Sequence, residues 1–217
     1  MGGNITETRS RLSAAERAYE HTKRLIIRGD LAGGTSVSEV AICDELGISR
    51  TPAHEAFLRL ASEGLLTLES RKGAIVRPMS PSESLDVLEM REAIESASAA
   101  RIVREHRQDD VVPYLRTLLD AQQSALANGD IDAFVEADDD VHTAVVVASR
   151  NPVAVQFIRV LRDRQQRLRH QLMRVQPAQL VAALDDHRGL VDAVRRGDAL
   201  EYAALLHSHI AKHQGSL

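Results

Sequence analysis

The sequence predicts a mainly α-helical protein, with an N-terminal winged helix-turn-helix followed by a C-terminal all-helical antiparallel bundle. The composition favours helices, because Ala, Leu, Arg and Glu are abundant while the 217 residues include only three Tyr, three Phe and no Trp. Strand candidates are confined to residues 66–77, where two short apolar runs flank a turn. Beyond residue 80, apolar residues recur at helical spacing and the connections are short, which is typical of an antiparallel bundle.

Length, composition and charge limit the class of protein. A chain of this length suits one large domain or two small ones, and 44% apolar with 27% charged residues is typical of a globular protein. There are 27 Lys and Arg against 31 Asp and Glu, a net charge of −4. Any nucleic acid would therefore be bound by a few positioned cations rather than by bulk charge.

The sequence contains no signal for a membrane or an oxidising compartment. No apolar run approaches the roughly 18–20 residues of a membrane helix, and the N-terminal residues lack the pattern of a signal peptide. The single Cys43 excludes an internal disulfide and a cysteine zinc cage. We therefore expect a cytoplasmic protein with no membrane partner.

Three helices are predicted within the first 65 residues. The first covers residues 14–28. The second begins with a capping box, in which Ser36 caps the helix and Glu39 reaches back, and it ends before Gly47. The third begins at residues 49–52, because proline is tolerated in a first helical turn.

A β-hairpin and a linker are predicted to follow. The strands cover residues 66–70 and 74–77, and residues 71–73 form the turn between them. Proline and serine residues at positions 78–81 mark a break in composition, which we interpret as a linker. The expected domains are residues 1–79 and 80–217.

The second domain is predicted to hold six helices. Ser80 can cap the first of them, with Pro81 in its first position and Glu83 three residues after the cap. Glycine followed by aspartate ends one helix and caps the next at two of the connections. The expected helices cover residues 81–106, 109–128, 131–149, 152–175, 178–196 and 199–213.

The second and third predicted helices, joined by a short turn, form a helix-turn-helix pattern. In that motif the second helix enters the major groove of DNA, where Arg50 and Thr51 would stand at its N-terminus. Arginine can bridge O6 and N7 of guanine, and threonine can bind a phosphate or contact a thymine methyl group. Arg71 and Lys72 at the hairpin tip would then contact the DNA backbone or minor groove. A small helical subdomain with an arginine at a cap would show the same spacing.

Four metal-ligating side chains fall on apolar helix faces. Asp138 and His142 are four residues apart and share the buried face of one predicted helix, while His187 and His209 occupy inward positions on two others. A carboxylate on such a face costs several kcal/mol unless it is paired or binds a metal. One Asp and three His suit Zn²⁺, Ni²⁺, Mn²⁺ or Fe²⁺. For each of the three histidines, the alternative is a buried ring that is hydrogen-bonded to a backbone carbonyl.

The remaining histidines and the arginines of residues 152–175 are expected to be solvated. The histidines are His21, His106, His170, His207 and His213. The arginines are Arg159, Arg162, Arg164, Arg167, Arg169 and Arg174.

Residues 14–79 closely resemble the winged helix of GntR-type bacterial transcription regulators. The motif SRTP at residues 49–52 carries the resemblance, together with EA, RL and EGL at the offsets of the family. The resemblance implies that Arg50 and Thr51 contact DNA, that Arg59 lies on the phosphate side, and that Arg71, Lys72 and Gly73 form the wing. His54 departs from the family, which usually has a DNA-contacting arginine there, so the preferred operator sequence is expected to differ.

Residues 80–217 resemble the six-helix form of the FCD effector domain, found in the FadR branch of the same family. The cues are REAIE at residues 91–95, Asp138 with His142, the segment DHRGLVDAVRRGD at residues 186–198, and His209. The resemblance implies that Asp138, His142, His187 and His209 hold a divalent metal ion, whose open positions take the carboxylate of a small organic acid. Arg91 matches an arginine of that pocket.

These patterns together predict a homodimeric transcription regulator that binds a double-stranded DNA operator. Its operator affinity would be modulated by a small carboxylate effector bound at the metal. Two alternatives use the same residues. The ion itself could be the effector, or the second domain could be a metal-dependent hydrolase, although no general base can be named at fixed spacing.

Overall fold

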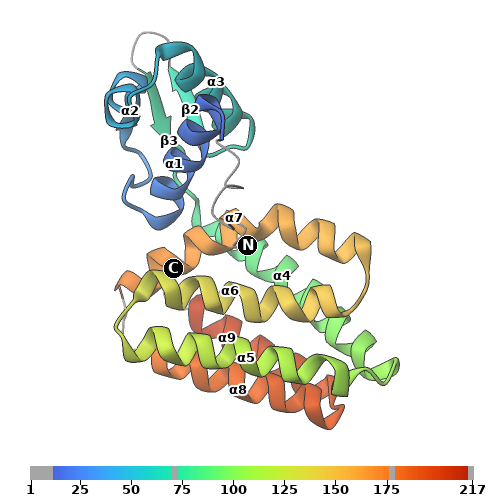
Figure 1. The fold of residues 1–217 in the computed structure, drawn as a ribbon. Coiled ribbons are helices and arrows are strands. Elements are labelled where there is room, and N and C mark those ends of the chain that lie inside the picture. Colours follow the sequence, from blue (N-terminus) through green and yellow to red (C-terminus); the bar gives the residue numbers. More distant parts are fainter. Residues whose placement is uncertain (1–11, 70–72, 176–178, 215–217) are drawn as a thin grey trace, which may run out of the picture. The chain divides into compact units, whose positions relative to one another are not determined.

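The computed structural model describes residues 12–69, 73–175 and 179–214 (Figure 1). The chain divides into two compact units, Met1–Pro78 and Met79–Leu217. Among the described residues, no helix is long and apolar enough to cross a membrane.

Within its described residues, the first unit combines three helices with a three-stranded antiparallel sheet. The helices are α1 (Ala14–Arg28), α2 (Glu39–Leu46) and α3 (Arg50–Ser62). The strands are β1 (Ser36–Val37), β2 (Leu66–Glu69) and β3 (Gly73–Val76), in the order β1-β3-β2. Ile26, Phe57 and Leu60 pack with Leu66 and Val76 into one buried core. This core fixes α3 in place and leaves the opposite side of the helix exposed.

The start of α2 differs from the predicted capping box, because the helix is capped by Ser38 and not by Ser36. Ser36 lies in β1, opposite Ile75 of β3, and Ser38 is the residue whose hydroxyl accepts a hydrogen bond from the Val40 N–H at 3.2 Å. Pairing with β3 buries Val37, so the chain is still extended where the pattern placed a helix cap. The predicted end of α2 is confirmed, because Gly47 adopts a left-handed conformation with φ 62°.

The described part of the second unit is a closed ring of six helices. They are α4 (Pro81–Arg104), α5 (Gln108–Ala127), α6 (Ile131–Ala148), α7 (Pro152–Val175), α8 (Gln179–Arg196) and α9 (Ala199–Gln214). Around the ring α4 contacts α7, then α6, α5, α8 and α9 follow, and α9 returns to α4. The expected all-helical bundle is confirmed, including Ser80 as the cap of α4, whose hydroxyl accepts from the Glu83 N–H at 3.1 Å.

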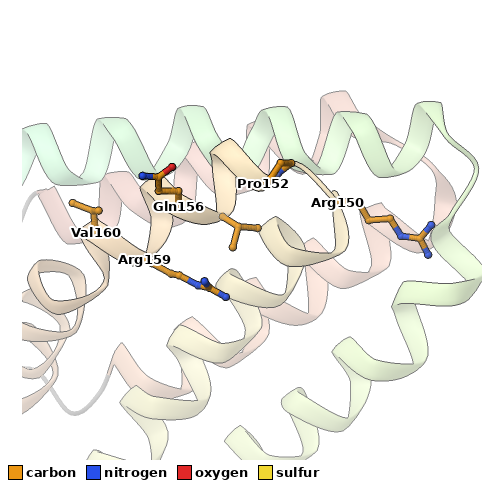
Figure 2. Close-up of a pocket in the computed structure, with 6 residues that line it drawn as sticks. Arg150, Pro152, Gln156, Arg159 and Val160 are labelled. Atoms are coloured by element: carbon orange, nitrogen blue, oxygen red, sulfur yellow. The ribbon is translucent and has the colours of Figure 1, made fainter.

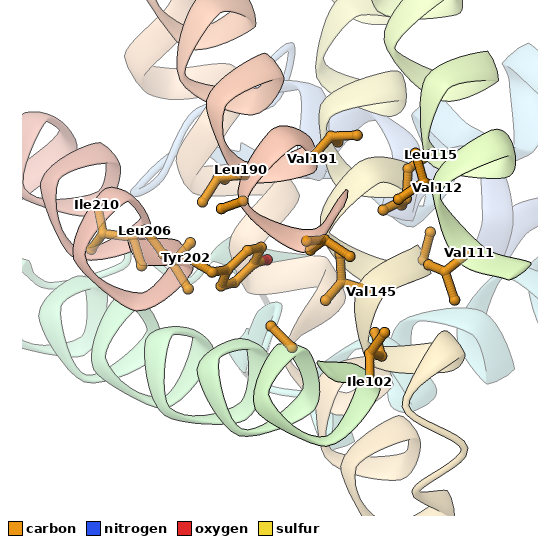
Figure 3. Packing of buried hydrophobic residues seen from close by; sticks show 14 of the residues in the cluster. Ile102, Val111, Val112, Leu115, Val145, Leu190, Val191, Tyr202, Leu206 and Ile210 are labelled. Carbon is orange, nitrogen blue, oxygen red and sulfur yellow. The ribbon is translucent and has the colours of Figure 1, made fainter. Parts of the chain in front are cut away.

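The core of this unit has an apolar cluster on each side of a polar layer. One cluster contains Ile102, Leu115 and Tyr202 (Figure 3), and the other contains Phe134 and Leu184. On α5, α6 and α8 the buried polar residues fall between these clusters along the chain. Buried polar groups need partners, so this layer is where a functional site is expected.

Candidate metal centre and nucleic-acid interface

The polar layer brings the four predicted metal-ligating residues together. Asp138 and His142 project from α6, His187 from α8 and His209 from α9. One ligand atom from each lies within 4.8 Å of the others, and all four residues are at most 1% exposed. Residues far apart in the sequence therefore form one buried cluster of three imidazoles and one carboxylate.

Two of the rings are oriented by acceptors on other helices. Nδ1 of His142 lies 2.7 Å from Oε2 of Glu95 on α4, and Nδ1 of His187 lies 2.8 Å from Oε1 of Gln122 on α5. Both acceptors require a proton on Nδ1, so the lone pair of each neutral ring is on Nε2. These two Nε2 atoms are 3.0 Å apart.

The third ring follows the same pattern. Nδ1 of His209 lies 3.1 Å from Oδ2 of Asp186, and that carboxylate is itself held by Nζ of Lys212 at 2.7 and 2.8 Å. In the neutral form of this ring, the Nδ1 proton of His209 points to Asp186 and Nε2 carries the lone pair. An acceptor on the distal nitrogen of each imidazole is the usual arrangement around a protein-bound metal.

The electrostatics favour a cation among these lone pairs. Burial lowers the pKa of His142 well below its ordinary value, and the positive charge of Arg91 lowers it further. Burial also lowers the pKa of His187. Both rings are consequently neutral, and neither Nε2 has a proton to donate to the other. Two facing lone pairs at 3.0 Å are stabilised by a positive ion between them.

Asp138 supplies the negative charge of the cluster. Burial alone would raise the pKa of its carboxyl, but the positive charge of Arg169 holds that pKa well below the usual range. Nε of Arg169 lies 2.5 Å from Oδ2, and Nε2 of His187 lies 3.3 Å from Oδ1. Neither oxygen accepts a hydrogen bond of good geometry from the described residues. An ionised oxygen and three imidazole nitrogens form a donor set that fits a first-row divalent ion.

Arg169 corrects the expectation that the arginines of α7 are solvated. It is 3% exposed, and besides Asp138 it contacts Oδ1 of Asp139 through Nη1 at 2.8 Å. Asp139 also accepts from Arg162 at 2.8 Å and Gln166 at 3.2 Å. The guanidinium is buried because two adjacent carboxylates of α6 face it.

His170 is likewise buried rather than solvated, whereas His207 is exposed as expected. The side chains of Arg174 and His213 lie outside the described residues.

Arg91 lies in the same buried layer. It is 1% exposed, and its Nε donates to Oε1 of Glu95 at 2.7 Å, so Glu95 bridges Arg91 and His142. Among the described residues, Nη2 of Arg91 and Nη2 of Arg169 have no hydrogen-bond partner. Two buried guanidinium groups with unsatisfied donors are suited to an anion.

Glu95 and Gln122 were not among the predicted site residues, although the sequence contains a signal for each. Arg91 and Glu95 follow Leu88 by three and seven residues, the positions of an apolar face, and Gln122 follows Leu115 by seven. Polar residues at positions where the periodicity requires apolar ones indicate a buried polar layer.

The helix-turn-helix exposes one face of α3. Arg50, Thr51 and His54 are exposed near its N-terminus, while Ala53 and Phe57 are buried on the other side. Nδ1 of His54 lies 2.8 Å from Oε1 of Glu39 on α2. Arg50, Thr51 and His54 are the residues that the motif would direct toward DNA.

Arg59 and the wing occupy different environments. The Arg59 guanidinium lies 3.5 Å from the ring centroid of Tyr19, 2.9 Å from Glu16 and 3.4 Å from Glu63. Arg71 and Lys72 lie outside the described residues. Gly73 begins β3 with φ +86°, and a Cβ there would lie 2.8 Å from the carbonyl oxygen of Val37, which explains the glycine.

A separate surface hollow lies along the first turns of α7 (Figure 2). Its volume is about 580 Å³. It shares no residue with the buried cluster. The lining residues are Arg150, Pro152, Val155, Gln156, Arg159 and Val160.

The first unit has a helix-turn-helix followed by the strand pair β2 and β3, and the second unit is all-helical. This combination is typical of a DNA-binding regulator, and comparisons with known proteins agree. Residues 14–76 match the bacterial regulatory proteins of the gntR family, and residues 86–212 match the FCD domain. The chain belongs to the GntR family of transcriptional regulators and carries its FCD domain. It is a transcriptional regulator and not an enzyme, which excludes the hydrolase alternative.

Individual relatives cover most of the chain. An uncharacterised HTH-type transcriptional regulator in the TAR-I ttuE-ttuC' intergenic region of Agrobacterium vitis is 30% identical over 151 residues, which is 69% of this chain and 86% of the relative. The HTH-type transcriptional repressor RspR of Escherichia coli is 28% identical over 88% of this chain and 84% of its own length. The galactonate operon transcriptional repressor of Escherichia coli is 27% identical, covering 89% and 93%.

Solved structures share the fold. Escherichia coli McbR/YncC has a TM-score of 0.76 at 22% identity, covering 93% of this chain and 95% of that one. A GntR regulator from Rhodococcus sp. RHA1 has a TM-score of 0.77 at 20% identity, covering 94% and 97%.

Proposed function

We propose that this chain binds operator DNA through α3 and that a small organic acid, bound at a divalent-metal site in the helical unit, changes its operator affinity. The observation that carries the proposal is the convergence of Asp138, His142, His187 and His209, with ligand atoms within 4.8 Å of one another. Two relatives are named repressors, and we extend that role to this chain.

The metal would be held by these four residues and would be Zn²⁺, Ni²⁺, Mn²⁺ or Fe²⁺, the ions that suit nitrogen and oxygen donors. When bound, it would supply a Lewis acid to which a carboxylate can bind. Glu95 and Gln122 orient the rings of His142 and His187, so the ligand atoms need little rearrangement. Arg169 keeps the Asp138 carboxyl ionised.

The effector is proposed to be a small carboxylate. The Nη2 groups of Arg91 and Arg169 are buried donors that a carboxylate can satisfy. In the buried layer these two cations face the three carboxylates of Glu95, Asp138 and Asp139. A divalent ion would leave one positive charge in excess, which one bound carboxylate would neutralise. We therefore favour acids with a single charge near the metal.

The DNA interface is proposed to consist of Arg50, Thr51 and His54 on α3 and the wing residues Arg71, Lys72 and Gly73. Arg59 can reach a phosphate only by leaving Glu16 and Glu63. We further propose that the chain acts as a homodimer, so that two copies of α3 bind a palindromic operator.

The coupling between the two units is a linkage effect. A carboxylate that binds one arrangement of the dimer more tightly must shift operator affinity by the same free energy, typically about 1–3 kcal/mol. That range corresponds to a roughly 5- to 150-fold change in the dissociation constant of the operator.

A gel-shift titration with the DNA upstream of the protein's own gene tests the DNA half of the proposal. Arg50→Ala is expected to weaken binding by about tenfold or more, because it removes a charged contact at the N-terminus of α3. Arg104→Ala, which removes one positive charge from α4, is the control and is expected to bind as the wild type does. Equal binding by Arg50→Ala and wild type would contradict the assignment.

A second titration distinguishes the effect of the metal on operator affinity from the effect of the organic acid. Organic acids are expected to change operator affinity for metal-loaded protein and to have no effect after chelation. If chelation alone changes the affinity and acids do nothing, the ion is the effector.

A further inference from the structure

His54 occupies the centre of the exposed face of α3. Arg50 lies one turn before it and Leu58 one turn after it, and all three are exposed. The His54 side chain is 56% exposed, yet one ring nitrogen is already engaged: Nδ1 lies 2.8 Å from Oε1 of Glu39. This pair joins the two helices of the helix-turn-helix.

The partner of Nδ1 decides what the other nitrogen can do. A carboxylate only accepts hydrogen bonds, so the Glu39 contact places the proton of the neutral imidazole on Nδ1. Nε2, on the far edge of the ring, is then a hydrogen-bond acceptor. An arginine at the same position would present donors alone.

Base edges in the major groove differ in the same respect. Guanine offers the acceptors O6 and N7, and thymine offers the acceptor O4. Adenine offers the N6 amino group as a donor and cytosine offers the N4 amino group. An acceptor on α3 therefore discriminates in favour of adenine or cytosine.

We propose that Glu39 fixes the tautomer of His54, so that Nε2 accepts a hydrogen bond from the amino group of an adenine or a cytosine in each operator half-site. This inference rests on the proposed placement of α3 in the major groove. Glu39 is a positioning residue here: it acts on DNA through His54. Its negative charge would also weaken non-specific attraction to the phosphate backbone.

The fixed position of Glu39 supports its role. It is the first residue of α2, directly after the cap Ser38, whose hydroxyl accepts from the Val40 N–H. Its side chain is 28% exposed, so it is partly covered while it holds the imidazole. The carboxylate is thus presented by a capped helix end rather than by a mobile loop.

The test is selection of binding sites from duplexes with randomised half-sites, using the full chain at about pH 8, where a reference imidazole is neutral. The position contacted by His54 is the one whose preference disappears in His54→Ala. There, wild type is expected to enrich adenine and cytosine by about five- to tenfold over guanine and thymine. His54→Arg is expected to enrich guanine instead.

Two isosteric variants test whether Glu39 fixes the tautomer of His54. In Glu39→Gln the amide can donate to Nδ1, which frees Nε2 to carry the proton, so the preference for adenine and cytosine is expected to fall to less than about twofold. Glu55→Gln removes the same charge from an exposed position of α3 and is expected to keep the wild-type preference.

Guanine at that position for wild type, or an unchanged preference in Glu39→Gln, would overturn the inference. The same holds if His54→Ala alters no position of the selected site. If wild type enriches no sequence at all, the proposed DNA-binding function of α3 fails, and this inference fails with it.

Discussion

Nε of Arg169 lies 2.5 Å from Oδ2 of Asp138 in the interior of the helical unit. The pair joins α7 to α6 and keeps the one carboxylate of the metal-ligating cluster ionised. Arg169 also contacts Asp139 at 2.8 Å, so a single guanidinium serves two buried acids. The protein therefore holds the charged member of the candidate metal-binding cluster in place through its own ion pairs.

Replacing Arg169 is expected to destabilise the protein strongly. Arg169→Met leaves Asp138 and Asp139 as buried acids without their shared cation, and breaking a buried pair in this way costs about 3–5 kcal/mol. Urea unfolding followed by circular dichroism measures the loss. A saturating divalent ion should recover part of it, because the ion is an alternative positive partner for Asp138.

The matched control is Arg159→Met, which removes an exposed arginine from the same helix and should change the unfolding free energy by about 0.5 kcal/mol or less. Similar losses in both variants would show that the buried pair contributes little.

Metal binding is expected to raise the thermal stability of the helical unit, because every helix of the ring supplies a side chain to the site. An ion at about 100 times its dissociation constant adds about 2.7 kcal/mol. That corresponds to a rise of roughly 5–10 °C in Tm. The contributing residues are Glu95, Gln122, Asp138, His142, Arg169, His187 and His209.

Differential scanning calorimetry with and without Zn²⁺ measures this shift. His142→Ala should lose it, while His207→Ala, an exposed histidine of α9, should keep it. A shift retained in His142→Ala would place the ion elsewhere.

Gln122 is expected to affect metal affinity more than stability. Gln122→Leu removes the acceptor that orients the His187 ring at 2.8 Å, and loss of such an outer partner typically lowers metal affinity about 10- to 100-fold. Competition against a chromophoric chelator measures the dissociation constant. Gln123→Leu, at the neighbouring exposed position, is the control. Unchanged affinity in Gln122→Leu would mean that packing alone orients the ring.

The metal-free protein is expected to lose stability as the pH falls below about 6.5. Burial lowers the pKa values of His142 and His187 in the folded state, so the unfolded chain binds protons in this range while the folded protein does not. Stability then decreases toward low pH, by at most about 2.7 kcal/mol per pH unit for two protons.

Asp138 affects the stability of the folded protein at a lower pH than the histidines do. Its folded-state pKa is lowered, so its contribution is present above the ordinary carboxyl pKa and is lost only as the pH falls further. Urea titrations between pH 7 and 5 measure how the unfolding free energy depends on the two buried histidines. His142→Gln should reduce the slope by about half, and His207→Gln should leave it unchanged. A flat profile for the wild type would contradict buried neutral imidazoles.

Most helix boundaries, apart from the start of α2, and the inward positions of the four clustered residues were predictable from the sequence, because both follow from local periodicity. Asp138 and His142 lie on an apolar face of one helix, and His187 interrupts an apolar face of another. Their meeting in one cluster was implied by the resemblance to the FCD domain, because the spacing alone leaves a separately buried histidine as an alternative.

Two features could not be predicted, for physical reasons. Arg169 is buried only because two carboxylates from α6 face it, and this long-range pairing is invisible in the local charge pattern of α7. Ser36 resembles a helix cap, but pairing with β3 at Ile75 keeps the chain extended and moves the cap to Ser38. In both cases a tertiary contact overrides local propensity.

X-ray absorption at the K-edge of Zn²⁺ or Ni²⁺ bound to the full chain tests whether Asp138, His142, His187 and His209 hold a metal ion. We expect one ion per chain with three imidazole nitrogens at about 2.0–2.1 Å and carboxylate oxygen in the same shell. In His187→Ala the imidazole contribution should fall by a third or the ion should be lost. A shell without imidazole scattering, or one that His187→Ala leaves unchanged, would contradict a metal centre at these four residues.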